Sequence, residues 1–353
     1  MTAPAPLHDL PAAAALPAPI EIVVGVYLRA LREANGRSLA DAALWAQVSV
    51  STISRLERAE NSLSPHTLES LLHYYGVPER EIEYLQSRLP RAKPGTRHVT
   101  TRSSRVRKPS GDGDLFQRGR WDKWVDVAGG AAVARYAAVA RAASETVYYT
   151  LFRIPTGYRT PAYREAINAP ESCPHPDEPA EAPSWLEHVR HSRPPRRVLL
   201  LDETVLRRPV AGPEAMAGQL RHLLDLMDGR DSPGPVSIRV LPCDRPSEVI
   251  QFAGGEVGAF TVHGNRLIAG MHTAPWYETG SAYAHTLHEA LQRAVEEAAG
   301  EEDSYALITS ALFRAGAHHL AGDGSALAGS RRSSVVGCLA RRRVLGEPRG
   351  VRP

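Results

Sequence analysis

Residues 38–58, with the sequence SLADAALWAQVSVSTISRLER, constrain the fold of this chain more than any other stretch. Ser38 precedes a short stretch that is expected to be helical. Asp41 occupies the third position of that helix, as in a capping box with Asp in place of Glu. Ser49 is expected to cap a second helix in the same way. The stretch therefore predicts two short helices that are joined by a tight bend at residues 47–49.

The second of these helices has one apolar face and one polar face. Ile53 and Leu56 form the face that is expected to be buried. The residues expected to be exposed are Val50, Ser51, Ser54, Arg55 and Arg58. A helix of this kind can lie in the major groove of DNA while the preceding helix braces it, and Arg55 can reach the O6 and N7 atoms of a guanine.

Three further helical patterns surround this pair. The first covers about residues 20–35 and stops at an Asn-Gly pair, which is typical of a helix C-terminus. The next begins after Ser64, where a capping residue precedes a proline at the first helical position, and the last begins after Pro78. Residues 20–88 are therefore expected to form an all-α domain of five helices.

The segment LRALREANGRSLADAALWAQVSVSTISRLERAENSLSPHTLESLLHYYGV resembles the DNA-binding domain of the phage-repressor (XRE) family, and the likeness covers about residues 22–87. It implies base contacts by Val50, Ser51 and Arg55. It implies phosphate contacts by Ser38, Thr52, Arg58 and Asn61. It also implies a shielded, structural ion pair between Arg32 and Glu57. The chain departs from the family at Gln47, where the bend often has Gly, and at Leu39, where a polar residue is common.

The charge of this domain does not favour DNA by itself. Residues 20–87 carry nine acidic residues and six Lys or Arg, a formal net of −3, which is poor for binding a polyanion. The following segment, residues 88–108, carries eight Lys or Arg and no acid. We expect residues 89–120 to be a flexible basic linker that tracks phosphates or enters the minor groove. The alternative is a solvated linker with no role in binding.

The ends of the chain have a low-complexity composition. Residues 1–19 are rich in Ala and Pro without a basic start, so a disordered leader is expected and not a secretion signal. Residues 316–353 are rich in Gly, Ser and Arg and are expected to form a disordered basic tail. The chain contains no run of about 18 apolar residues, so no membrane span is predicted. Cys173, Cys243 and Cys338 have no metal-ligand spacing and are interpreted as three unrelated thiols.

Residues 121–315 alternate helical and strand-like patterns, so the chain is expected to be multidomain, with an all-α helix-turn-helix domain followed by an α+β regulatory domain. A helix bearing Trp124, Val133, Tyr136 and Ala140 should open this part. The strands expected are TVYYTLFRIP, VLLLD, VSIRVLP and a hairpin, GAFTVHG–NRLIAGM, that turns at residues 263–265. Two helices, AYAHTLHEALQRAVEEAA and SYALITSALFR, should close it.

This second region resembles the C-terminal domain of actinobacterial regulators of the WhiJ type, which are described as antitoxin-like. The motifs that carry the likeness are the IPTGYRTPAY turn, the LDETVLRRPVAGPEAMAGQLRHLLDL segment and the VSIRVLP strand. The resemblance implies a regulatory role and names no ligand.

Patterns that could support catalysis are weak. His285 and His288 share a helix face but lack a third metal ligand, and Asp202 with Glu203 is expected to cap a helix or to pair with Arg207 and Arg208. Cys173 and His175 lie in a Pro-rich loop, where a nucleophile is not expected. Five apolar residues are expected in the core, with a small-molecule pocket as the alternative: Phe260, Met271, Trp276, Tyr277 and Tyr283. We expect no enzyme activity, no metal and no cofactor.

These patterns favour a cytoplasmic, nucleoid-associated transcriptional regulator that binds double-stranded DNA with sequence specificity. A homodimer on a pseudo-palindrome is expected, because one short helix makes few base contacts. The second domain would then serve dimerisation, partner binding or ligand sensing. One alternative is an antitoxin-like protein that binds a small companion protein and regulates its own operon. Another is an enzyme that carries a DNA-targeting domain.

Overall fold

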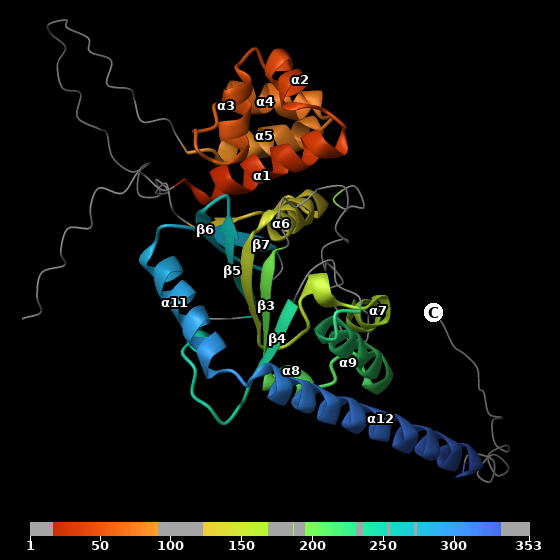
Figure 1. Cartoon of the computed structure of the whole chain (residues 1–353). Helices are drawn as coiled ribbons and strands as arrows, with labels where there is room; N and C mark the ends of the chain where they lie inside the picture. Colours follow the sequence, from red (N-terminus) through yellow and green to blue (C-terminus); the bar gives the residue numbers. More distant parts are fainter. Residues whose placement is uncertain are drawn as a thin grey trace, which may run out of the picture.

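The computed structural model describes residues 17–90, 123–168, 186, 195–230, 236–252, 255–271 and 274–332, with side chains as far as residue 316. Five helices precede a mixed region built around one seven-stranded sheet (Figure 1). The predicted fold class is confirmed, because an all-α helix-turn-helix domain precedes an α+β domain. Several predictions fall outside the described residues: the leader before residue 17, most of the 89–120 linker, the Cys173 and His175 loop, Cys338 and the tail beyond residue 332.

The first domain consists of α1 (Pro19–Ala34), α2 (Leu39–Trp45), α3 (Val50–Glu57), α4 (Pro65–Tyr74) and α5 (Glu79–Arg88). Three of these helices begin at serine caps. The hydroxyls of Ser38, Ser49 and Ser64 each accept a backbone N–H bond of 3.1 Å from the third helical residue. These caps satisfy N–H groups that would otherwise have no partner, which is why the sequence alone located these helix starts.

The sheet has the strand order β1-β7-β6-β5-β2-β3-β4. Its strands are β1 (Trp124–Val125), β2 (Glu145–Thr150), β3 (Arg196–Asp202), β4 (Val236–Leu241), β5 (Glu256–Val262), β6 (Asn265–Met271) and β7 (Pro275–Glu278). The pairs β2–β3 and β3–β4 are parallel, and the other neighbouring pairs are antiparallel. The β5–β6 hairpin turns where it was expected, with positive φ angles at His263 and Gly264.

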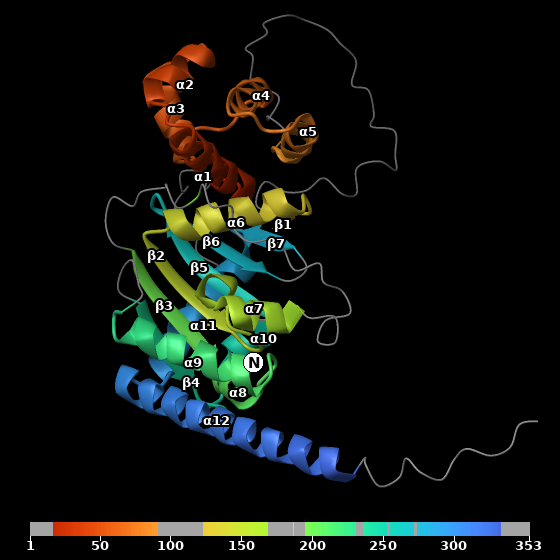
Figure 2. The same cartoon turned by 90° about the vertical axis from the view of Figure 1, so that its right-hand side faces the viewer.

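Helices cover both faces of the sheet (Figures 1 and 2). They are α6 (Gly130–Ala142), α7 (Pro161–Asn168), α8 (Glu203–Arg207), α9 (Pro213–Met227), α10 (Val249–Phe252), α11 (Ala282–Glu297) and α12 (Glu301–Arg332), with a 3-10 turn at Thr156–Tyr158. Tyr148 faces the core under α6 and α9, and the next residue, Tyr149, faces the core under α11. This alternation is why the buried strands read as nearly continuous apolar runs.

Four details differ from the sequence expectations. Trp124 does not lie in a helix but in β1, where it pairs with Tyr277 of β7, a strand that was not predicted. The helix that follows begins only at Gly130. The backbone of α12 continues as a helix to Arg332, beyond the expected domain end at residue 315. None of the helices in the described part of the chain combines the length and hydropathy needed to cross a bilayer.

The five aromatic and apolar residues weighed as a pocket do not line a common cavity. Phe260, Met271 and Tyr277 belong to the core on the α6 side of the sheet, whereas Trp276 packs on the α11 side. Tyr283 is 37% exposed on α11. Packing in the core or at the surface therefore accounts for all five.

The first helix is shared by both domains, which the sequence did not reveal. Thirteen of the sixteen residues of α1 are buried, so the helix is covered on opposite faces. One face meets α3 and the opposite face meets α6, and a single continuous apolar cluster contains residues of both domains. Figure 2 shows α1 lying directly above α6. The five-helix domain and the sheet domain therefore share one hydrophobic core.

Gly25 provides a test of how closely α1 approaches α3. A Cβ atom at this position would lie 2.6 Å from the carbonyl oxygen of Leu56, which is rigid backbone. We expect Gly25→Ala to lower the free energy of unfolding by about 1–3 kcal/mol, since overpacking forces the helices apart. Gly218→Ala in α9 is the control, because it meets no atom within 4 Å and should stabilise by about 0.5–1 kcal/mol. Urea unfolding followed by circular dichroism measures both, and equal shifts would contradict the close approach.

Candidate nucleic-acid interface

The start of α2 is held by a complete capping box. The Ser38 hydroxyl accepts the N–H of Asp41 at 3.1 Å, and the Asp41 carboxylate accepts the Ser38 N–H at 2.8 Å. The Ser38 hydroxyl also donates to that carboxylate, at 2.7 Å. These hydrogen bonds to Ser38 lower the pKa of Asp41. Asp41 therefore keeps a negative charge at the site where a phosphate contact was predicted.

The bend between α2 and α3 adopts a left-handed conformation without glycine. Gln47 has a φ angle of +53°, so a side chain occupies the position where the resemblance led us to expect Gly. The N–H of Val48 then donates to the carbonyl of Ala43 at 3.0 Å, which closes the end of α2. Buried Ala42 and Ala43 allow the two helices to pack closely. The departure at Gln47 therefore leaves the helix-turn-helix geometry intact.

The first turn of α3 carries a network of hydroxyl groups. The Ser49 hydroxyl accepts the N–H of Thr52 at 3.1 Å, and it lies 2.8 Å from the hydroxyls of both Ser51 and Thr52. The network fixes these side chains at the positively polarised end of the helix. Hydroxyls held in this way can donate to phosphate oxygens, and they can donate to or accept from base edges.

The two faces of α3 are those predicted from the sequence. Ile53 and Leu56 are buried, whereas Val50 is 47% exposed and both Ser51 and Arg55 are exposed. The three residues that the resemblance assigns to base contacts therefore share the solvent face of one helix. Their contact with DNA stays a prediction.

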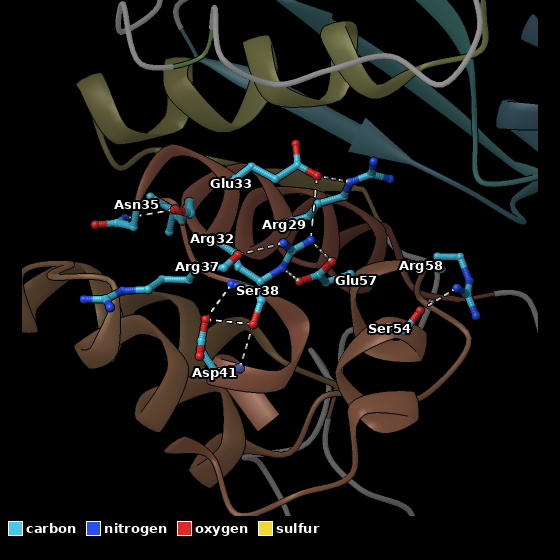
Figure 3. A network of polar contacts seen from close by, with 11 residues as sticks. Arg29, Arg32, Glu33, Asn35, Arg37, Ser38, Asp41, Ser54, Glu57 and Arg58 are labelled. Carbon is cyan, nitrogen blue, oxygen red and sulfur yellow. Dashed lines mark hydrogen bonds and ion pairs between the residues drawn. The ribbon is translucent and has the colours of Figure 1, made fainter. Parts of the chain in front are cut away.

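A buried ion pair fixes α3 against α1 (Figure 3). Arg32 Nε and Nη2 donate to the two carboxylate oxygens of Glu57, at 2.6 and 2.9 Å, and Arg32 Nη1 donates to the carbonyl of Arg37 at 3.1 Å. Burial by itself lowers the pKa of Arg32, but the hydrogen bonds and charge of Glu57 outweigh burial and raise that pKa. The ion pair predicted between these residues is present and shielded from solvent.

The predicted phosphate-contacting residues differ in their surroundings. Thr52 takes part in the hydroxyl network, and Asn61 is half-buried in the α3–α4 loop. Arg58 donates to both carboxylate oxygens of Glu60, at 2.6 and 2.9 Å, and to the Ser54 hydroxyl at 2.6 Å. The hydrogen bonds from Arg58 lower the pKa of Glu60. Arg58 therefore has to exchange one carboxylate partner for another anion before it can hold a phosphate.

Each of the two domains matches a known family model. A family model described as a helix-turn-helix domain matches residues 23–85, and it includes the whole of α2 and α3. A second model, described as a domain of unknown function (DUF5753), matches residues 133–310, which is half of the chain. The chain belongs to the DUF5753 family. No curated protein and no solved structure matches it.

The candidate catalytic residues of the DUF5753 domain have structural partners. Asp202 caps α8 through a 2.9 Å bond from the Thr204 N–H, and Glu203 accepts from Arg207, as expected. His285 pairs with Glu289 at 3.2 Å on α11. Within the described residues, no three His, Cys, Asp or Glu side chains gather as metal ligands.

Two residues of the DUF5753 domain lie near the C-terminal end of α3, and sequence reasoning missed both. Asn265 Nδ2 donates to the carbonyl of Arg58 at 3.3 Å. The charges of Arg29, Arg58 and Glu60 act on the neighbouring His263, which is largely buried. These contacts join residues about 200 positions apart, so helical spacing gives no sign of them. The β5–β6 hairpin thus reaches the end of α3.

The Arg32–Glu57 pair should be far more important for stability than its exposed neighbour. We expect Arg32→Met to lower the free energy of unfolding by about 3–5 kcal/mol, because it leaves a buried carboxylate without its partner. Arg29→Met, which removes the partly exposed Arg29–Glu33 pair, should cost about 0.5 kcal/mol or less. The double variant Arg32→Met/Glu57→Leu should recover most of the loss. Chemical denaturation measures all three, and a small loss for Arg32→Met would contradict this role.

The hairpin contact should weaken in mild acid. Burial lowers the pKa of His263, and the charges of Arg29 and Arg58 lower it further. An unfolded chain therefore takes up this proton first, and the stability present above the ordinary pKa of about 6.5 is lost as pH falls through and below that value. His263→Asn keeps a residue that tolerates the positive φ angle but cannot titrate. Unfolding midpoints between pH 7 and 5 should fall more steeply in the parent chain; parallel curves would contradict this role of His263.

Proposed function

We propose that the chain is a sequence-specific DNA-binding transcriptional regulator, and that α3 lies in the major groove. The observation that supports this most strongly is the solvent face of α3. It presents Val50, Ser51 and Arg55 together, on a helix whose other face is fixed by the Arg32–Glu57 pair. The match of residues 23–85 to a helix-turn-helix domain supports the same function.

In this proposal the three residues read different features of the bases. The guanidinium of Arg55 donates two hydrogen bonds to guanine, the Ser51 hydroxyl bonds a base edge, and the Val50 methyl groups contact a thymine methyl. Arg55 suits this role because, among the described residues, it makes no ion pair within 4.0 Å. The phosphates on either side are held by Thr52, Asn61, Ser38 and Arg58. Arg58 first has to leave its carboxylate partner, Glu60.

Affinity for the backbone then has to come largely from outside the acidic first domain. We infer that basic residues of the 88–108 segment supply it, since each phosphate neutralised by Lys or Arg releases counterions. A homodimer on a pseudo-palindrome would double the few base contacts of one helix. The DUF5753 domain would serve dimerisation or sensing, and the protein would act at the nucleoid.

Replacement of Arg55 should relax sequence selectivity. In gel-shift titrations with the upstream region of its own gene, we expect Arg55→Ala to cost about 1–3 kcal/mol on the specific site and little on unrelated DNA. Arg80→Ala, which removes an exposed Arg from the start of α5, is the matched control. If the parent chain gives no specific retardation and Arg55→Ala changes nothing, the proposed function is wrong. Co-purification of a small companion protein would favour the antitoxin-like alternative.

Neutralising the linker should act differently. We expect a variant with Arg102, Arg105, Arg107 and Lys108 changed to Gln to bind all sequences more weakly. Its plot of log affinity against log salt should be flatter, by up to about 0.9 for each phosphate that the variant no longer neutralises. If this variant and Arg55→Ala affect specific and unrelated DNA alike, the proposed division between base reading and phosphate binding is wrong.

A further inference from the structure

The helix-turn-helix domain and the DUF5753 domain make a specific polar contact through Arg135 of α6. Its Nε and Nη2 atoms donate to the two carboxylate oxygens of Asp126, at 2.7 and 2.9 Å, and its Nη1 atom donates to Glu81 of α5. The side chains of Arg135 and Asp126 are fully buried. One guanidinium therefore connects the sheet domain with the helical domain.

Arg135 also contacts the shared helix. Its guanidinium lies 5.4 Å from the centre of the Tyr27 ring in α1, which is within the range of a cation–π interaction. Val23 and Ala30 are buried one turn to either side of Tyr27, so they extend this face of α1 toward the α6 side. Burial by itself lowers the pKa of Arg135, but the hydrogen bonds and charge of Asp126 outweigh it, so the guanidinium stays charged.

Three further contacts join the domains at separate places. The Tyr84 hydroxyl of α5 accepts the N–H of Val127 at 3.1 Å, next to the Arg135 cluster. At the end of α3, Asn265 donates to the Arg58 carbonyl. At the start of α1, the Thr279 hydroxyl donates to the carbonyl of Pro17 at 3.2 Å. These contacts lie in α5, directly after α3 and directly before α1, and contacts at three separate places fix an orientation, whereas a single flexible tether does not.

We propose that the DUF5753 domain fixes the orientation of α3 relative to the rest of the chain, with Arg135 and Glu81 as the positioning residues. This inference rests on the proposed function, in which α3 binds DNA. In a dimer joined through its DUF5753 domains, the two copies of α3 would face DNA at one fixed separation. The contact between the two domains of each chain would then set the spacing between half-sites. A helix-turn-helix domain on a loose tether would accept several spacings.

Glu81 and Tyr84 allow the contact to be weakened without emptying the buried site. Glu81→Gln/Tyr84→Phe removes the charge and the hydroxyl on the α5 side but leaves Arg135 paired with Asp126. Glu83→Gln, an exposed change on the same helix, is the matched control. Asn265→Ala is a second variant, which removes only the hydrogen bond to Arg58.

The orientation can be measured without DNA. Spin labels at Leu44→Cys in α2 and Gln292→Cys in α11, with the three native cysteines changed to Ser, report the distance between the domains by double electron–electron resonance. We expect one narrow distribution for the otherwise unchanged chain and for Glu83→Gln, and a broader one for Glu81→Gln/Tyr84→Phe. Asn265→Ala removes one hydrogen bond beside the shared core and should broaden the distribution less. A broad distribution in the otherwise unchanged chain, or no broadening in either variant, would overturn the proposal.

The DNA readout separates this proposal from the proposed function. On duplexes whose half-sites are moved apart one base pair at a time, the unchanged chain should bind one spacing best. Glu81→Gln/Tyr84→Phe should bind that spacing several-fold more weakly and discriminate less among the others. Unchanged spacing preference in a variant with a broadened distance distribution would also overturn the proposal. Absence of specific DNA binding with a narrow distance distribution would instead refute the function and leave the fixed orientation standing.

Discussion

The burial of α1 on two opposite faces is the constraint on which the rest of the structure depends. A helix that is apolar nearly all round has to be covered on all sides, and neither domain can cover α1 by itself. The first domain uses one face to seat α3, through Gly25 and Arg32. The second uses the other face to seat α6. The chain is thus organised around a helix that belongs to both cores.

The surface near α3 combines side chains in fixed positions with a net negative charge in the surrounding domain. Asp41 and Glu60 hold Ser38 and Arg58 in defined positions, but each also places a carboxylate beside a residue that is predicted to contact phosphate. Rigid side chains lose little conformational entropy on binding, which strengthens binding to a partner that matches their positions. The segment that follows, residues 88–108, carries eight Lys or Arg and no acid, so the positive charge lies outside this surface.

The sequence predicted the local features of the fold well and the distant contacts poorly. Serine caps, a Pro at the first helical position and 3.6-residue periodicity act within a few residues, so the five helices and the buried face of α3 could be predicted. The family pattern supplied the Arg32–Glu57 pair. Strands β1 and β7 are short and pair across about 150 residues, so Trp124 was placed in a helix. The contacts of Arg135 and Asn265 could not be predicted, because nothing local marks their partners.

The shared helix also has a consequence for the order in which the chain is made. A ribosome adds about 5–20 residues each second, so α1 emerges on the order of ten seconds before α6 and β7, the elements that cover its second face, are complete. During that interval the face of α1 that meets α6 has no partner from the second domain. A nascent helix-turn-helix domain therefore leaves the α6-facing side of α1 exposed to solvent until the second domain is synthesised. The first domain therefore reaches its final packing only when the second domain is complete.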